Sequence, residues 1–158
     1  MSLTALKNLY FMLQTADAAS ILPILKKIPL LAELNEADHK EIIQHIEMQY
    51  FPAKQLIFKE NDPGDAVYII KRGVVRIFHP GPDNPVEDVD VAVLGDNDVF
   101  GEMAIISEKP RNASAAAVEE SEVFVLKKED FVQLVSSNPN MASRISEEFL
   151  KRFKINQK

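Results

Sequence analysis

The chain has 158 residues, 46% of them hydrophobic, and it contains no cysteine. This length suits one domain with a single core, and the absence of cysteine excludes disulfides, a thiolate nucleophile and cysteine metal sites. A net charge of −6, from 18 basic and 24 acidic residues, argues against a broad electrostatic grip on nucleic acid or an anionic membrane. No apolar run approaches the roughly 18 residues of a membrane span, so we expect an uncleaved, soluble cytoplasmic protein.

Apolar residues with helical spacing predict two short helices, over residues 6–13 and 21–28. We assign residues 1–20 to an N-terminal helical extension and residues 21–158 to the main domain. Asn35 is expected to cap a third helix that runs to about Ile46, because its side chain can accept a hydrogen bond from the first turn.

From residue 46 to residue 126 the pattern changes to short β-rich runs separated by turn residues. The predicted strands cover residues 46–51, 56–59, 67–71, 73–78, 86–94, 113–118 and 122–126. Asn61 and Asn97 lie in two of the turns, where asparagine tolerates positive φ. The proline-rich segment 79–85 is expected to be an irregular surface loop. These features predict an α+β fold: an antiparallel β-roll, that is, a jelly-roll-like double-stranded β-helix, flanked by N- and C-terminal helices.

After the roll, a helix is predicted over residues 128–136 and a final helix over about residues 140–154. Apolar residues recur every four positions along the final helix, at Met141, Ile145, Phe149 and Phe153. This stripe must be covered, either by the roll itself or by a partner, and the pattern leaves both open.

Residues 99–114 combine a glycine, a carboxylate and a guanidinium in one short segment. Gly101 allows close backbone approach to a ligand, and residues 102–106 are predicted to form a short helix whose first N–H groups attract an anion. Arg111 offers a planar fork of donors for two phosphate oxygens, while Glu102 can accept hydrogen bonds from ribose hydroxyls. Taken alone, Glu102 and Arg111 would favour an ordinary ion pair, but with Gly101, Ala104, Pro110 and Ala113 in register these residues predict a sugar-phosphate site.

Two motifs carry a family resemblance. The first reads Phe100-Gly101-Glu102-x-Ala104 and then Pro110-Arg111-x-Ala113-Ser114, and the second reads Pro63-Gly64-Asp65-x-x-Tyr68-x-Ile70-x-x-Gly73-x-Val75. Together they resemble the phosphate-binding cassette and the strand-turn-strand signature of cyclic nucleotide-binding domains, a family that includes catabolite activator proteins and kinase regulatory subunits. The resemblance extends over residues 22–156.

The resemblance implies a regulatory domain that binds a cyclic mononucleotide, with allosteric output through the C-terminal helix. The implied ligand-binding residues are Gly101, Glu102, Met103, Ala104, Arg111, Asn112 and Ala113. Glu102 would hold the ribose 2′-hydroxyl and Arg111 the cyclic phosphate. A threonine after the arginine would favour cGMP, so Asn112 favours cAMP. We expect a homodimer or an effector protein to bind through the terminal helices, and neither nucleic acid nor a membrane to be a partner.

The sequence contains none of three common enzyme motifs, G-x-x-x-x-G-K, G-x-S-x-G and H-E-x-x-H. The three histidines, His39, His45 and His79, do not share an i, i+4 face, so we expect no metal site, no cofactor and no catalytic residues.

Two alternatives stay open. A degenerate member of the family would act as a ligand-free interaction or oligomerisation module, with Arg111 neutralised by Glu102 or Glu108. The chain could also be the sensor piece of a longer kinase, channel or cyclase-linked protein.

Overall fold

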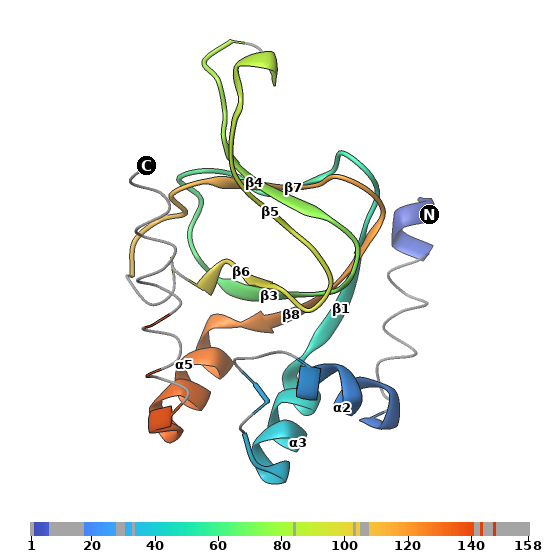
Figure 1. The fold of residues 1–158 in the computed structure, drawn as a ribbon, viewed down its shortest axis with the longest axis vertical. Coiled ribbons are helices and arrows are strands. Elements are labelled where there is room, and N and C mark those ends of the chain that lie inside the picture. Colours follow the sequence, from blue (N-terminus) through green and yellow to red (C-terminus); the bar gives the residue numbers. More distant parts are fainter. Residues whose placement is uncertain are drawn as a thin grey trace.

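Two four-stranded antiparallel sheets face each other, and helices lie against the outer side of one of them (Figure 1). The computed structural model describes residues 2–6, 18–27, 31–32, 34–83, 85–102, 104, 108–140, 143 and 147. This arrangement confirms the predicted β-roll with flanking helices.

The strands alternate between the two sheets along most of the chain. The first sheet has the order β1-β8-β3-β6, formed by β1 (Glu47–Phe51), β8 (Ser121–Lys127), β3 (Ala66–Arg72) and β6 (Val99–Phe100). The second has the order β2-β7-β4-β5, formed by β2 (Leu56–Phe58), β7 (Ser114–Ala117), β4 (Val75–His79) and β5 (Val89–Leu94). Because every neighbouring pair except β4 and β5 joins strands that are not consecutive in the chain, the roll depends on long-range pairing such as Met48 opposite Phe124.

Two apolar clusters use opposite faces of the first sheet. On β3, Val67 and Ile69 face the helices, whereas Tyr68 and Ile70 face the second sheet. Successive side chains of a strand point to opposite faces, so a strand buried on both sides must be apolar at nearly every position. This explains why β3 reads as a continuous apolar run.

The helices that cover the first sheet are α2 (Ala18–Lys27), α3 (Glu36–His45) and α5 (Lys128–Ser137). They contribute Leu25, Ile42 and Phe131 to the cluster beneath that sheet. The predicted cap of α3 is confirmed, because Asn35 Oδ1 accepts a hydrogen bond from the Asp38 N–H at 2.8 Å.

The two terminal helical predictions fall mostly outside the described residues. Residues 3–6 are helical, but most of the predicted helix 6–13 is not described. At the other end, Pro139, Asn140, Ser143 and Glu147 have helical backbone, whereas the predicted stripe of Met141, Ile145, Phe149 and Phe153 lies outside the described part. No helix within the described ranges is long and apolar enough to cross a membrane.

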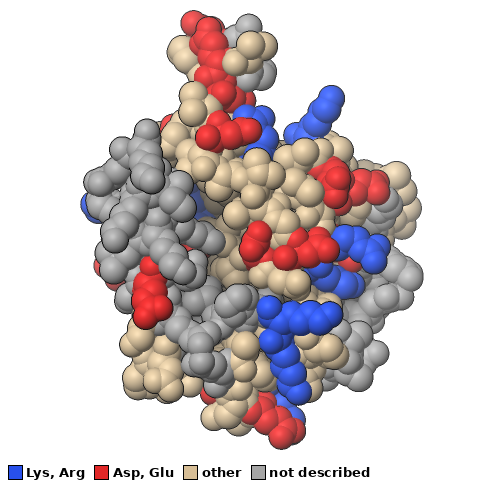
Figure 2. All heavy atoms as spheres, viewed as in Figure 1, with Lys and Arg blue, Asp and Glu red and all other residues tan. Residues whose placement is uncertain are grey.

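Two turn predictions are confirmed, since Asn61 and Asn97 have φ of 74° and 69°. The predicted strand over 86–94 begins three residues late, because a 3-10 helix, η1 (Pro85–Glu87), occupies its start. Residues 80–83 form no regular element, as expected of the loop, and the β4–β5 hairpin projects from the roll (Figure 1). Figure 2 shows acidic side chains on this projection.

Candidate ligand-binding site

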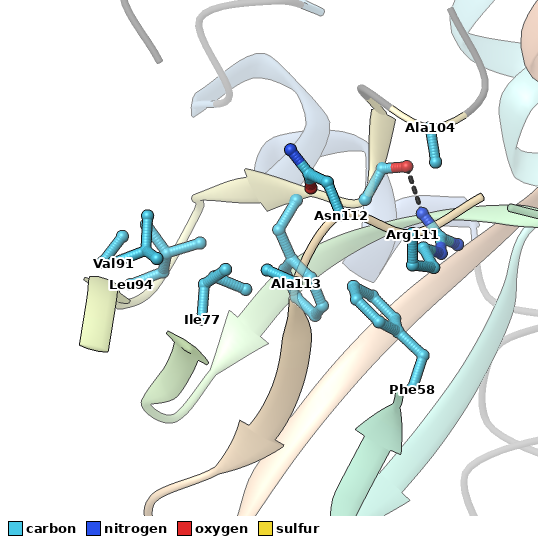
Figure 3. Close-up of a pocket in the computed structure, with 11 residues that line it drawn as sticks. Phe58, Ile77, Val91, Leu94, Ala104, Arg111, Asn112 and Ala113 are labelled. Carbon is cyan, nitrogen blue, oxygen red and sulfur yellow. Dashed lines mark hydrogen bonds between the residues drawn. The ribbon is translucent and has the colours of Figure 1, made fainter. Parts of the chain in front are cut away.

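A cavity of about 90 Å³, open to solvent on one side, lies on the roll (Figure 3). Strands β2, β4, β5 and β6 and the segments on either side of residues 105–107 supply its walls. The lining residues are Phe58, Ile77, Val91, Ala92, Leu94, Phe100, Gly101, Ala104, Arg111, Asn112 and Ala113. The cavity is therefore largely apolar, with one ionised side chain, Arg111, in its wall.

A β-bulge explains why two consecutive residues, Val91 and Ala92, both line the cavity. In the β4–β5 pair Ile77 lies opposite Ala92 and Phe78 lies opposite Asp90, so Val91 is the extra residue. A bulge interrupts the alternation of a strand and re-aims the side chain at that point. Ala92 and Leu94 alternate normally along β5, so the bulge adds Val91 as a third apolar side chain from this strand to the wall.

Arg111 is almost fully enclosed, with 2% of its surface exposed. Its Nη2 donates a hydrogen bond to the Ala66 carbonyl at 2.7 Å, and its Nη1 donates to the Gly101 carbonyl, marked by the dashed line in Figure 3. Asp65 Oδ1 lies 4.0 Å from Nη2. Two backbone carbonyls therefore hold the guanidinium at the cavity wall.

The third guanidinium nitrogen, Nε, differs from Nη1 and Nη2 in its hydrogen bonding. Arg111 Nε is buried and has no hydrogen-bond partner among the described residues. Burial lowers the pKa of Arg111, while Tyr68, Asp65 and Glu102 raise it, and arginine remains charged near neutral pH. A buried cationic donor without a partner is expensive, so the site is suited to an anionic acceptor.

Backbone hydrogen bonds fix the chain at Arg111. Its N–H donates to the Asp62 carbonyl at 2.8 Å, and its carbonyl accepts from the Asn61 N–H at 2.7 Å. The positive φ of Asn61 belongs to the turn that makes this exchange. The turn after β2 therefore anchors the arginine that lines the cavity.

Gly101 permits the close contact with Arg111. Its φ is +85°, and a Cβ built there would lie 2.9 Å from Arg111 Nη1 and 3.1 Å from Tyr68 Cδ2. Both the backbone conformation and the lack of space require glycine at this position.

The structure brings together five of the predicted site residues: Gly101, Ala104, Arg111, Asn112 and Ala113 all line the cavity. Glu102 is buried, with 1% exposure, but is not one of the lining residues. Met103 lies outside the described residues. Glu102 and Ala104 have helical backbone, as expected for the predicted helix over 102–106, whose other residues are not described.

Sequence reasoning missed the apolar half of the cavity. Its members are Phe58, Ile77, Val91, Ala92, Leu94 and Phe100. Strand patterns mark such residues only as candidates for the core, and no signal in the sequence separates a cavity wall from a packed interior. No group of three or more histidine, aspartate or glutamate side chains in the described part of the chain could hold a metal ion.

Residues 48–138 match the family model of the cyclic nucleotide-binding domain. A cAMP-dependent protein kinase regulatory subunit of Emericella nidulans is 34% identical over 76% of this chain and 28% of that protein. A cyclic AMP receptor protein of Thermus thermophilus is 32% identical over 77% of this chain and 56% of that protein. The chain thus spans about a quarter to just over half the length of these relatives.

The crystal structure of the Thermus thermophilus catabolite activator protein has a similar fold. Its TM-score is 0.70 at 29% sequence identity, over 82% of this chain and 60% of that chain.

Proposed function

Because this chain belongs to the cyclic nucleotide-binding domain family, we propose that it binds a cyclic mononucleotide in the cavity beside Arg111 and acts as a regulatory domain. The observation that carries the proposal is the enclosed guanidinium of Arg111, whose Nε has no partner within the described part of the chain. A cyclic phosphate supplies both the negative charge and the acceptor oxygens that this group lacks.

The rest of the cavity supports a ligand with an apolar, flat portion. Ile77, Val91 and Leu94 offer hydrophobic surface to a purine, while Arg111 faces the phosphate. Burial of the base on these side chains provides affinity, and the charged hydrogen bonds provide orientation. The ligand therefore needs one anionic and one apolar part, as a cyclic nucleotide has.

The individual roles follow the family pattern. Arg111 binds the cyclic phosphate and Glu102 accepts a hydrogen bond from the ribose 2′-hydroxyl. The remaining contacts come from Gly101, Met103, Ala104, Asn112 and Ala113, several of them through backbone N–H groups.

We further propose cAMP as the preferred nucleotide. Asn112 follows the arginine and lines the cavity, and it replaces the threonine whose hydroxyl would favour guanine. The names of the Emericella and Thermus relatives refer to cAMP, which agrees with this choice.

The output of binding passes through the C-terminal helix. Described residues of this segment, including Pro139 and Asn140, are helical and are separated by Asn138 from α5, whose Phe131 and Leu134 are packed beneath the first sheet. A change at the cavity can therefore reach a terminal helix through the roll, and from there a second copy of the chain or an effector protein.

Calorimetric titration of the purified chain with cAMP and with cGMP tests the proposal. We expect saturable binding, tighter for cAMP, and a loss on the order of 2–5 kcal/mol of binding free energy in Arg111→Ala. Arg72→Ala is the matched control, because Arg72 is exposed at the end of β3 and does not line the cavity. Absence of binding heat and of any change in melting temperature with either nucleotide would overturn the proposal and favour a ligand-free interaction module.

A further inference from the structure

The aromatic ring of Phe58 covers one face of the Arg111 guanidinium. The guanidinium carbon Cζ lies 4.2 Å from the centre of this ring (Figure 3). Phe58 ends β2, is only partly buried, and lines the same cavity as Arg111. At this distance the cation is attracted by the negative face of the ring.

The ring restrains a motion that the hydrogen bonds leave open. The donors of a guanidinium lie in its plane, so the carbonyls of Ala66 and Gly101 hold its edge. Edge contacts resist sliding within that plane but only weakly resist tilting out of it. A ring packed on the face opposes the tilt, and thereby fixes the direction of the remaining Nε donor.

Phe58 is itself held in place by other aromatic rings. Its ring centre lies 5.7 Å from that of Tyr68 and 6.1 Å from that of Phe100, and the latter two rings are stacked at 5.1 Å. Tyr68 and Phe100 are also paired across β3 and β6 in the first sheet. The Phe58 ring that packs on Arg111 is therefore held by two rings that belong to the first sheet.

We propose that Phe58 is a positioning residue for Arg111: its ring holds the guanidinium in the orientation that receives the anionic group of the ligand. This inference rests on the proposed nucleotide site and adds to it a residue outside the two sequence motifs. Phe58 acts through Arg111, so its effect is expected on ligands that carry the phosphate and not on ligands that lack it.

The first arm of the test needs no ligand. Nuclear magnetic resonance of the Arg111 Nε–H group, assigned by its loss in Arg111→Lys, reports the ring directly, because a proton over an aromatic face shifts upfield. We expect this shift in the wild type and in Phe58→Tyr, and its loss in Phe58→Leu, which keeps an apolar side chain but removes the ring. An ordinary Nε–H shift in the wild type would overturn the proposal.

The second arm measures affinity for cAMP and for adenosine, which has the same base and sugar but no phosphate. We expect Phe58→Leu to weaken cAMP binding by about 3- to 30-fold relative to the wild type, and Phe58→Tyr to bind cAMP like the wild type. Adenosine binding by Phe58→Leu should stay within twofold of that of the wild type. The matched control is Phe78→Leu, because the Phe78 ring lies 4.0 Å from the Arg76 guanidinium and does not line the cavity. We expect it to bind cAMP like the wild type.

The outcomes separate this inference from the proposed function. Equal losses for cAMP and adenosine, or cAMP binding by Phe58→Leu within twofold of the wild type, would overturn the positioning role while leaving the nucleotide site intact. If the wild type bound neither cAMP nor cGMP, the proposed function would fail. The Arg111 Nε–H resonance would still decide whether Phe58 orients the guanidinium.

Discussion

Replacing Gly101 with alanine tests the packing around Arg111 most directly. The new Cβ would lie 2.9 Å from Arg111 Nη1 and 3.1 Å from Tyr68 Cδ2. Neither neighbour can move freely, because Nη1 belongs to a guanidinium held by two carbonyls and the Tyr68 ring is stacked on Phe100. The substitution must therefore displace the arginine, the ring or the backbone of residue 101 itself.

Two contributions set the size of the effect. A side chain at φ +85° costs about 1–2 kcal/mol relative to glycine. Forcing an extra methyl group into a packed region costs about 1–3 kcal/mol. We expect the free energy of unfolding to fall by about 2–5 kcal/mol, and the melting temperature to fall by about 4–20 °C for a domain of this size.

Urea unfolding and cAMP titration of Gly101→Ala provide the assay. Gly95→Ala is the matched control, because a Cβ at Gly95 would meet nothing within 4 Å. We expect the control to change stability by less than about 1 kcal/mol and to leave cAMP affinity unchanged. Equal stability of the two variants, or wild-type affinity in Gly101→Ala, would refute the argument that this close approach positions Arg111.

Three further predictions concern the roll and its helices. Asn35→Ala removes the cap on the Asp38 N–H and should lower the free energy of unfolding by about 1 kcal/mol in urea melts. Asn35→Ser keeps a side-chain acceptor and should retain most of the wild-type stability. Phe124→Ala, at a fully buried site, should cost about 3–5 kcal/mol; a loss below 1 kcal/mol would contradict its place in the core. Burial raises the pKa of the Tyr68 hydroxyl, so the folded state holds that proton more tightly than the unfolded chain does. The resulting stability is complete below the ordinary tyrosine pKa of about 10 and is lost as pH rises through the raised value. Urea unfolding between pH 8 and 11 should show a smaller alkaline loss in Tyr68→Phe, and identical pH profiles would rule this contribution out.

Local chemistry determined much of what could be predicted from this sequence. The Asn35 cap and the positive φ of Asn61 and Asn97 depend on one residue and its immediate neighbours, so single-residue rules were sufficient. The two spaced motifs likewise identified Gly101 and Arg111, because a glycine and a guanidinium at fixed spacing are visible without knowing the fold. The strands were predicted from runs of β-forming residues between turns, and only the two-residue β6 was too short to give such a signal.

The tertiary structure alone decided what surrounds the arginine. Arg111 donates to the carbonyl of Ala66, across 45 positions of sequence, and its guanidinium packs on Phe58. The bulge that adds Val91 to the cavity wall depends on the register between β4 and β5. The arginine contacts bring together residues far apart in the sequence, and the bulge depends on strand register, whereas the pattern of one strand specifies neither its partner nor its register. The sequence therefore determined which chemical groups the site contains, whereas the folding of the roll determined which of them meet and how the charge is held.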